Sequence, residues 1–473
     1  MTSLHAYRAI VVAVILYIII FGVVTALRHY NFQTQTWDMG VFDQLFWNTI
    51  HGRIMQGSIE EIPDHFGVHW SPGLLLLVPG YALFPSPYYL LFIQVLALAA
   101  GALPLYRLAM RMLQRESLAK LITVAYLLYP SLHWLNLFDF HEIAFFVPAL
   151  LAALYYADAE RWGWASFWFA IAASMKEDAI IAVAFAGLYF LIRRKDATFA
   201  WWNRNRLYAA FIALGALLYI VLAVKVFMPA FGGGLLRLDR YAALGSSVGE
   251  IVTNLVRNPT LFARTILTLP KMDYLLWLFA PLAFLPLFSG RAFLLIVPGL
   301  LENLLTTNRF QFSTFYQYDA ILIPGMFFCA VYGLRNVVRR WPAWERFARR
   351  ALVIAVAIGF FVRSPVNPFT FPFNLFGTNS RWQIFRELSR DIPENLSVTA
   401  QTNLLPHLAH REKIYQLGME RAFADVAFID INDPFGFGDN TDAFAAYAKQ
   451  YIENPAYDVT AYNDRYVVAR KKP

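Results

Sequence analysis

Two carboxylates stand in an aromatic setting directly behind the first long apolar run of the chain. That run, Ala9 to Leu27, holds no charge and is about as long as a membrane-spanning helix needs to be. Asp38 and Asp43 follow it, within the segment Trp37-Asp38-Met39-Gly40-Val41-Phe42-Asp43-Gln44. On one helix they would be offset by about 140°. An acid beside apolar surface gains proton affinity through desolvation, so either carboxylate is suited to hold a proton, a cation or a hydroxyl.

Further ionisable and aromatic residues gather in four other short segments. These are His65 and His69; Asp139, His141 and Glu142; Lys176, Glu177 and Asp178; and Arg309 with Tyr316, Gln317 and Tyr318. Each segment lies at a predicted outer end of an apolar run. Placing an ionisable residue at membrane depth costs free energy unless the residue is paired or hydrated. The convergence of these segments therefore predicts one polar cavity that faces the outer leaflet.

Several of these residues also have structural interpretations. Asp38 is placed to cap a helix that starts near Phe42. His65 and His69 have the i, i+4 spacing of a metal site if their segment is helical, but Gly67 and the following proline weaken that helix, which favours structural or substrate contacts.

The other segments leave similar alternatives open. His141 and Glu142 are adjacent and would lie on different faces of a helix, where Glu142 also suits the first turn. Lys176-Glu177-Asp178 is either a structural ion pair or part of the cavity, and Tyr316-Gln317-Tyr318 is either an interfacial aromatic belt or a sugar-stacking segment.

The composition places the chain among helical membrane proteins. Of its 473 residues 58% are hydrophobic and 15% are charged, against about 45–50% and about 25% in soluble domains. The net charge of +8 does not indicate nucleic acid, because the basic residues stand in short blocks at the ends of apolar runs. Cys329 is the single cysteine and cannot form an intrachain disulfide. No small-residue cleavage site follows the first apolar run, which we therefore expect to be a retained helix.

We expect an all-α polytopic membrane protein with about eleven transmembrane helices and the N-terminus in the cytoplasm. The predicted spans are 8–27, 87–109, 118–137, 142–158, 163–176, 178–193, 207–229, 271–289, 291–305, 317–336 and 349–364. Three basic blocks, at 107–120, 193–206 and 335–350, set the orientation by the positive-inside rule. The loops 28–86, 138–141, 230–270 and 306–316 then lie outside.

Two apolar stretches depart from simple spans. Residues 73–84 are too short to cross and are punctuated by prolines, so we expect them to be interfacial or re-entrant within the first outer loop. Residues 163–193 carry Lys176-Glu177-Asp178 at their centre, which predicts two half-length helices meeting at a charged turn that lines a cavity.

A composition change after about Asn374 divides the chain into a transmembrane domain, 1–377, and a C-terminal soluble α/β domain, 378–473, on the outer side. The tail is polar and rich in turn signals. Residues 396–400, 426–430 and 466–469 have the β-branched and aromatic character of short strands.

Several long motifs resemble a family of prokaryotic predicted membrane proteins of unknown function. They are Trp37-Asp38-Met39-Gly40-Val41-Phe42-Asp43-Gln44, Trp47-Asn48, His51-Gly52, His65-Phe66, His69-Trp70-Ser71-Pro72, Phe138-Asp139-Phe140-His141, Lys176-Glu177-Asp178, Tyr316-Gln317-Tyr318, Asn403-Leu404-Leu405-Pro406-His407-Leu408 and Ile414-Tyr415. That family looks like a branch of the GT-C superfamily of integral-membrane glycosyltransferases, which take a sugar from a polyprenyl-phosphate donor and hand it to an acceptor on the outer face.

The resemblance implies specific roles. The superfamily's mark is an acidic catalytic base in the first outer loop, and Asp38 falls at that mark, with Asp43 as the substitute. Inverting transfer to a lipid, glycan or protein acceptor would then use Lys176 or Arg309 for the departing lipid phosphate, the histidines for hydrogen bonds, and Tyr316 and Tyr318 for stacking. This scheme requires no metal or other cofactor, although the His and Asp residues leave a divalent metal possible.

Two rival classes share some of these features. Broken helices and charges at membrane depth also describe ion-coupled transporters. The one-sided clustering of charge, the long first loop and the absence of an inverted repeat argue against a transporter. A non-catalytic membrane scaffold, whose tail binds a partner, is the third alternative.

Overall fold

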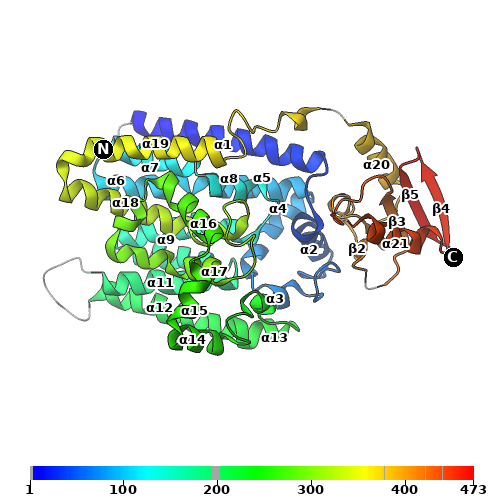
Figure 1. Cartoon of the computed structure of the whole chain (residues 1–473), viewed down its shortest axis with the longest axis horizontal. Helices are drawn as coiled ribbons and strands as arrows, with labels where there is room; N and C mark the ends of the chain where they lie inside the picture. Colours follow the sequence, from blue (N-terminus) through cyan, green and yellow to red (C-terminus); the bar gives the residue numbers. More distant parts are fainter. Residues whose placement is uncertain (1–3, 194–202, 378, 421, 439) are drawn as a thin grey trace.

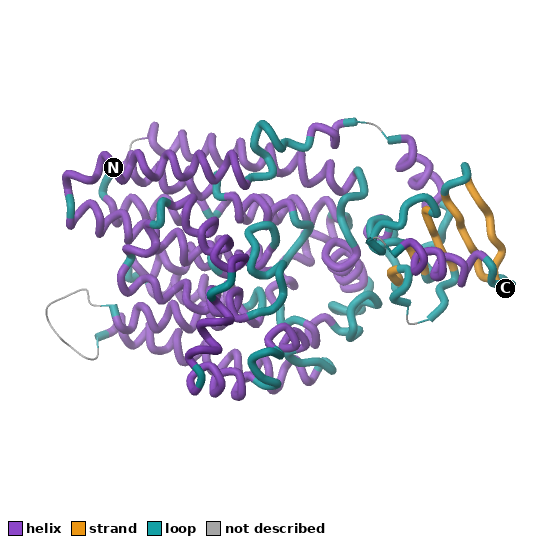
Figure 2. The backbone as a smooth tube through the Cα atoms, in the orientation of Figure 1, coloured by secondary structure: helices purple, strands orange, loops and turns teal. Residues whose placement is uncertain are grey.

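The computed structural model describes residues 4–193, 203–377, 379–420, 422–438 and 440–473. A bundle of helices forms most of the molecule, and a small sheet stands at one end (Figures 1 and 2). The longer helices run side by side along the long axis of the bundle (Figure 1).

The bundle consists of nineteen helices in the described residues, several of them short. They are α1 (Leu4–Tyr30), α2 (Val41–Ile50), α3 (His65–Val68), α4 (Val78–Leu83), α5 (Pro87–Ala100), α6 (Ala102–Leu113), α7 (Glu116–Leu127), α8 (Pro130–Leu137), α9 (Phe146–Asp158), α10 (Trp162–Ala173), α11 (Glu177–Ile192), α12 (Arg204–Leu222), α13 (Met228–Ala230), α14 (Val248–Arg257), α15 (Pro259–Ile266), α16 (Leu269–Phe279), α17 (Val297–Leu305), α18 (Ile323–Arg340) and α19 (Glu345–Arg363).

Short π-helical and 3₁₀ turns connect or extend these helices. They are η1 (Thr36–Gly40), η2 (Pro72–Leu77), η3 (Glu142–Phe145), η4 (Ala223–Phe227), η5 (Leu236–Tyr241), η6 (Ala280–Leu282), η7 (Leu285–Phe288), η8 (Gly290–Ile296), η9 (Gln317–Ile321), η10 (Pro342–Trp344) and η11 (Phe373–Phe376).

Within the described residues, three helical stretches are long and apolar enough to cross a membrane by themselves: Arg8–Tyr30, Pro87–Leu113 and Arg204–Ala230. The expectation of about eleven crossings is not confirmed by this criterion and stays a prediction. The predicted span 118–137 divides at Pro130, and the predicted span 271–289 divides at η6 and η7. Proline lacks the backbone N–H of a continuous helix, which explains these breaks.

Two predicted interruptions are confirmed. The segment Pro72–Leu83 forms η2 and α4 and is too short to cross. The two half-length helices expected at 163–193 are α10 and α11, and Lys176 is the residue that precedes α11.

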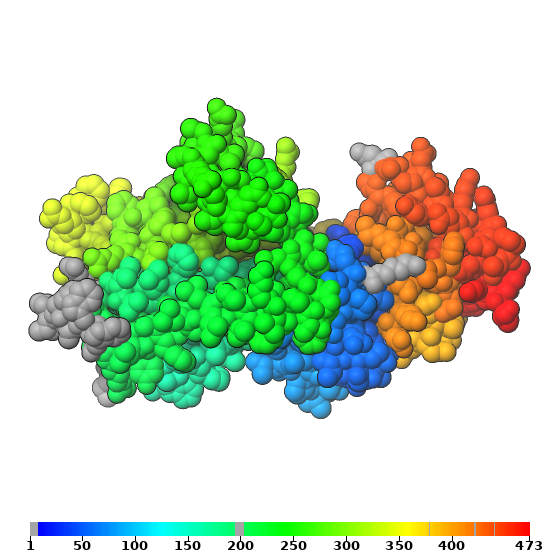
Figure 3. All heavy atoms as spheres, turned by 90° about the horizontal axis from the view of Figure 1, so that it is seen from below, coloured from blue at the N-terminus to red at the C-terminus, as the bar shows by residue number. Residues whose placement is uncertain are grey.

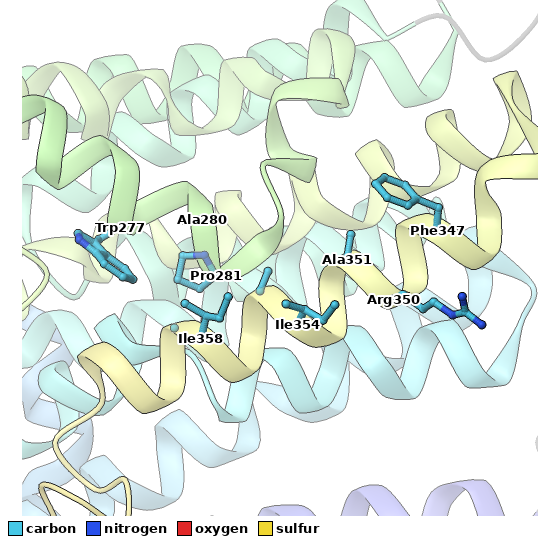
Figure 4. A pocket seen from close by; sticks show the side chains of 10 residues that line it. Trp277, Ala280, Pro281, Phe347, Arg350, Ala351, Ile354 and Ile358 are labelled. Atoms are coloured by element: carbon cyan, nitrogen blue, oxygen red, sulfur yellow. The ribbon is translucent and has the colours of Figure 1, made fainter.

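The outward faces of the bundle are apolar, as lipid contact requires. Phe211 and Leu214 of α12 are 70% and 67% exposed. Figure 4 shows a pocket of about 520 Å³ between Trp277, Pro281 and the helix α19, where Ile354 and Ile358 line it. None of the described residues that line this pocket is acidic.

The C-terminal part is an α/β domain with a five-stranded sheet. It contains α20 (Ser380–Arg390), η12 (Leu405–His407), α21 (Thr441–Ile452), β1 (Val398–Ala400), β2 (Ile414–Gln416), β3 (Val426–Asp430), β4 (Tyr457–Tyr462) and β5 (Tyr466–Lys471). The strand order is β2-β1-β3-β5-β4, with β2, β1 and β3 parallel and with β5 antiparallel to both β3 and β4. Strands β1, β3 and β5 match the predicted ones, whereas β2 and β4 carry no comparably strong apolar run.

The α/β domain packs on the segment that follows α1. Figure 3 shows its orange and red atoms against the blue atoms of that segment. Thr36 donates two 3.2 Å hydrogen bonds to Thr402, one from its backbone N–H to the Thr402 hydroxyl and one from its hydroxyl to the Thr402 carbonyl. The Ser58 hydroxyl donates to the Ile414 carbonyl at 2.7 Å and accepts the Ile414 N–H at 2.8 Å.

Close backbone approach between α18 and η7 generates a prediction. A Cβ built at Gly333 would lie 1.9 Å from the Leu285 carbonyl oxygen, whereas one at Gly215 meets nothing within 4 Å. We expect Gly333→Ala to lower the melting temperature of the detergent-solubilised protein by several degrees, because the two elements must separate. Gly215→Ala is the matched control and should melt at or slightly above the wild-type temperature. Equal melting temperatures for both variants would contradict this packing.

Candidate functional site

A cavity of about 930 Å³ lies where the predicted outer loops meet the bundle. Its walls come from η1, the α3 segment, η3, the start of α11, η5, α14, α17 and η9. The structure brings most of the sequence-predicted residues into this one cavity: Asp38, His65, His69, His141, Glu142, Lys176, Glu177, Asp178, Tyr316, Gln317 and Tyr318. Asp43, Asp139 and Arg309 do not line it.

Asp38 faces the cavity from η1, which is a short π-helical turn. Its Oδ1 lies 2.8 Å from Nε2 of His141, and about a fifth of its side chain is exposed, against 5% for His141. The residue before α2 is Gly40, and no side chain caps that helix. The interpretation of Asp38 as a helix cap is therefore wrong, and the carboxylate is held by a histidine from a distant segment instead.

Backbone contacts hold the His141 segment in place. The amide of Gln94, on α5, donates to the Asp139 carbonyl at 2.7 Å and accepts the His141 N–H at 2.8 Å. Asp139 has a φ of 49°, a left-handed conformation that Asp tolerates better than most residues. Its carboxylate accepts the N–H of Gln35 at 2.7 Å. Asp139 thus ties the η1 segment to the His141 segment from behind the cavity wall.

Asp43 lies in a different environment from Asp38. It is 1% exposed, and its Oδ1 accepts the Tyr81 hydroxyl at 2.6 Å. Its Oδ2 lies 3.1 Å from Nε2 of His410 in the α/β domain. Asp43, the expected substitute for Asp38, therefore does not line the cavity and instead contacts that domain.

His65 and His69 contact separate carboxylates. His65 Nδ1 lies 2.8 Å from Glu60 Oε2, and its Nε2 lies 3.0 Å from the Ser71 hydroxyl. His69 Nδ1 lies 2.8 Å from Glu177 Oε1. The two rings thus act in two ion-pair systems, which agrees with the structural or substrate-contact interpretation.

The break between α10 and α11 supplies a third buried ion pair. Lys176 Nζ lies 2.8 Å from Glu142 Oε1, and the Glu142 side chain is 2% exposed. Glu177 also accepts the Trp70 N–H at 3.0 Å, so the first turn of α11 is bound to the first outer loop. Asp178 lines the cavity beside them.

The aromatic segment at η9 forms another wall. Tyr316 packs edge-on against Phe138 at 4.8 Å between ring centroids. The Arg240 guanidinium stands 5.6 Å from the centroid of Tyr318 and donates to Gln311 Oε1 at 3.4 Å. Tyr316 and Tyr318 are thus placed at the cavity.

Sequence reasoning missed several residues of this cavity. They are Glu60, Arg237, Arg240, Tyr241, Glu302 and Gln311. Arg237 and Arg240 lie in the predicted outer loop 230–270, so their charge and topological side were available signals. They were not identified because no recognised motif lies near them in the sequence. Arg237 pairs with Glu61 at 2.9 Å.

The described residues that line the cavity include more carboxyl groups than permanent cations. The carboxylates are Asp38, Glu60, Glu142, Glu177, Asp178 and Glu302, and the permanent cations are Lys176, Arg237 and Arg240. Burial alone would lower the pKa of His141 and of His65, but Asp38 and Glu60 respectively hold each pKa above its ordinary value. These raised pKa values favour the charged forms of His65 and His141, which offset part of the carboxylate charge.

No group of three or more His, Cys, Asp or Glu side chains in the described part of the chain is arranged to hold a metal ion. The expectation that transfer needs no metal stays a prediction.

Comparisons with known proteins place the chain in a wider context. The family described as "Predicted membrane protein (DUF2079)" matches residues 28–466. No curated protein matches the chain. The crystal structure of ArnT from Cupriavidus metallidurans in the apo state, a GT-C glycosyltransferase, is similar with a TM-score of 0.53 and 12% identity over 98% of each chain. At that identity the likeness shows a common fold.

Asp139 generates a pH prediction. Burial raises its pKa from 3.8 to about 7, although the Arg28 guanidinium opposes the shift. Between these pH values the folded protein retains a proton that the unfolded chain releases. The contribution to stability is therefore fully present below pH 3.8 and is lost as the pH rises to about 7.

Asp139→Asn keeps an uncharged acceptor at this position. We expect the melting temperature of the wild type, relative to that of the variant, to fall between pH 5 and pH 8. A constant difference across that range would show that Asp139 does not titrate there.

Proposed function

Because the chain belongs to the DUF2079 family of predicted membrane proteins and has the fold of a GT-C enzyme, we propose that it is an integral-membrane glycosyltransferase. It moves a sugar from a polyprenyl-phosphate donor to a lipid, glycan or protein acceptor on the outer face of the cell membrane. In this proposal the chain crosses the membrane about eleven times, with the N-terminus in the cytoplasm and the α/β domain outside.

The Asp38–His141 pair at the cavity wall is the observation that carries the proposal. Asp38 presents a partly exposed carboxylate to the cavity, and His141 fixes its orientation at 2.8 Å. A carboxylate placed in this way accepts the proton of an acceptor hydroxyl as that oxygen attacks the anomeric carbon. One attack from the face opposite the leaving phosphate inverts the anomeric configuration.

The departing lipid phosphate needs a cation. Lys176 is bound to Glu142 and Arg237 to Glu61, whereas Arg240 makes one long hydrogen bond to an amide and a ring contact. We therefore assign the phosphate to Arg240, with Lys176 as the second positive charge of the cavity. Arg309 does not line the cavity, so it loses the role that the sequence suggested.

The cavity also has surfaces for the rest of the donor. Ile181, Phe185, Val248, Val252 and Leu301 form an apolar wall, which suits a prenyl chain. The rings at η9 suit the sugar, because aromatic faces pack against the C–H groups of a pyranose. The remaining polar residues, among them Asp178 and Gln317, supply hydrogen bonds to sugar hydroxyls.

The two aspartates of the first outer loop provide the first test. We expect Asp38→Asn to lower kcat by roughly 10²–10⁴-fold in the lipid-reconstituted protein, because general-base catalysis contributes a rate factor of that size. Asp43→Asn should retain transfer within a few-fold and instead lower the melting temperature, because Asp43 contacts the α/β domain. The assay is sugar transfer or release from a panel of radiolabelled polyprenyl-phosphate sugars.

Near-normal transfer by Asp38→Asn would exclude Asp38 as the base. Movement of a labelled solute across the bilayer without a covalent product would instead support the transporter class.

Arg240 gives a second test through its role in binding. A charge-assisted hydrogen bond contributes about 1.5–3 kcal/mol, so Arg240→Gln should raise KM for the donor by at least about tenfold. Arg309→Gln removes the same charge from a residue outside the cavity and should leave KM within twofold. Equal effects of the two substitutions on KM would remove Arg240 from the phosphate site.

A further inference from the structure

A second cavity, of about 1120 Å³, lies at the opposite end of the helical bundle. The helix α11 connects the two cavities: Glu177 at its start lines the first, and Arg193 just past its end lines the second. Sixteen helical residues span about 24 Å, which is most of the roughly 30 Å of a bilayer's hydrocarbon core. In Figure 1 the labels of α6 and α18, two helices that carry lining residues of this cavity, lie toward the end of the bundle marked N, away from the α/β domain.

Six arginines line this cavity, and they come from all three basic blocks of the sequence and from η8. They are Arg111, Arg115, Arg193, Arg291, Arg335 and Arg339. Among the described lining residues Asp158 is the one carboxylate. The positive-inside rule explains why basic residues stand at the ends of spans. It does not explain why arginines that are distant in sequence face one common cavity.

Asp158 organises one wall of the cavity. It is 1% exposed and lies 3.0 Å from Arg111 Nε and 2.6 Å from Arg193 Nη1. The Tyr332 hydroxyl donates to the same carboxylate at 2.8 Å. The Asp158 carboxylate thus orients two guanidinium groups. Because it neutralises only one of their two positive charges, this wall of the cavity keeps a net positive charge.

The other arginines retain most of their hydrogen-bonding capacity. Arg291 donates to the Ile192 carbonyl at 3.0 Å, and Arg335 stands 6.0 Å from the ring centroid of Tyr332. Within the described residues no ion pair engages Arg291, Arg335 or Arg339, whereas Arg115 pairs with Glu345. Guanidinium groups around one cavity repel one another, and an anion that bridges them removes the repulsion.

We propose that this arginine cavity binds a phosphate-bearing anion. Guanidinium groups bind phosphate oxygens in bidentate fashion, and a cavity of this volume accommodates a phosphodiester or a pyrophosphate. The headgroup of an anionic lipid and a soluble phosphate compound share this chemistry. Basic pockets between membrane helices on the cytoplasmic side are known to hold lipid headgroups. The inference concerns the end of the bundle opposite the proposed catalytic cavity and does not depend on glycosyl transfer.

The test measures binding to the purified full-length protein. Inorganic pyrophosphate is titrated by calorimetry in neutral detergent, and retained phosphatidylglycerol is counted by native mass spectrometry against phosphatidylcholine. The lining variant is Arg335→Gln with Arg339→Gln. Its control, Arg340→Gln with Arg346→Gln, removes equal charge from exposed residues that do not line the cavity.

We expect the lining variant to weaken binding of at least one probe by about tenfold or more, and the control to stay within twofold of the wild type. Arg339→Gln alone, an exposed position that folding tolerates, should give a smaller loss. A lipid-only effect identifies a headgroup site, and an effect on pyrophosphate identifies a soluble ligand. Binding of neither probe by the wild type, or equal losses in the lining variant and the control, would overturn the proposal.

Discussion

The pairing of buried charges at one end of an apolar bundle is the constraint on which the first cavity depends. Lys176 with Glu142, and His69 with Glu177, each join segments that are distant in sequence. Removing one member of such a pair leaves an unpaired charge in a poorly solvated site. This costs more stability than replacing both members by apolar side chains. The pairs therefore hold the first outer loop, the η3 segment and the start of α11 in one arrangement, and the cavity is the space between them.

The first outer loop contacts both the first cavity and the α/β domain. Its η1 turn presents Asp38 to the cavity, while the neighbouring Thr36 bonds to Thr402 and Asp43 contacts His410. The α/β domain thus supports the turn that carries the proposed base. A movement of this domain would be transmitted to Asp38 through two residues of backbone, which gives the domain a route to influence the cavity without lining it.

Much of the cavity was predictable because its charges are costly in an apolar chain. Lys176, Glu177 and Asp178 interrupt an apolar stretch, and the structure places a helix break there. Arg240 was not predictable in the same way, because its loop carries no recognised motif and its neighbour Tyr318 is 78 residues further along the chain. The helix break inside the predicted span 118–137 was not predicted, because hydropathy does not register backbone breaks at prolines such as Pro130.

The sequence alone determined the membrane class, the C-terminal strands β1, β3 and β5, and the gathering of unusual charges in outer loops, since each follows from local composition and periodicity. Only the tertiary structure decided that Asp38 faces the cavity while Asp43 faces the α/β domain. It also decided that arginines from three basic blocks surround one cavity. Both outcomes depend on which segments pack together, and contacts between residues tens to hundreds of positions apart leave no trace in local pattern.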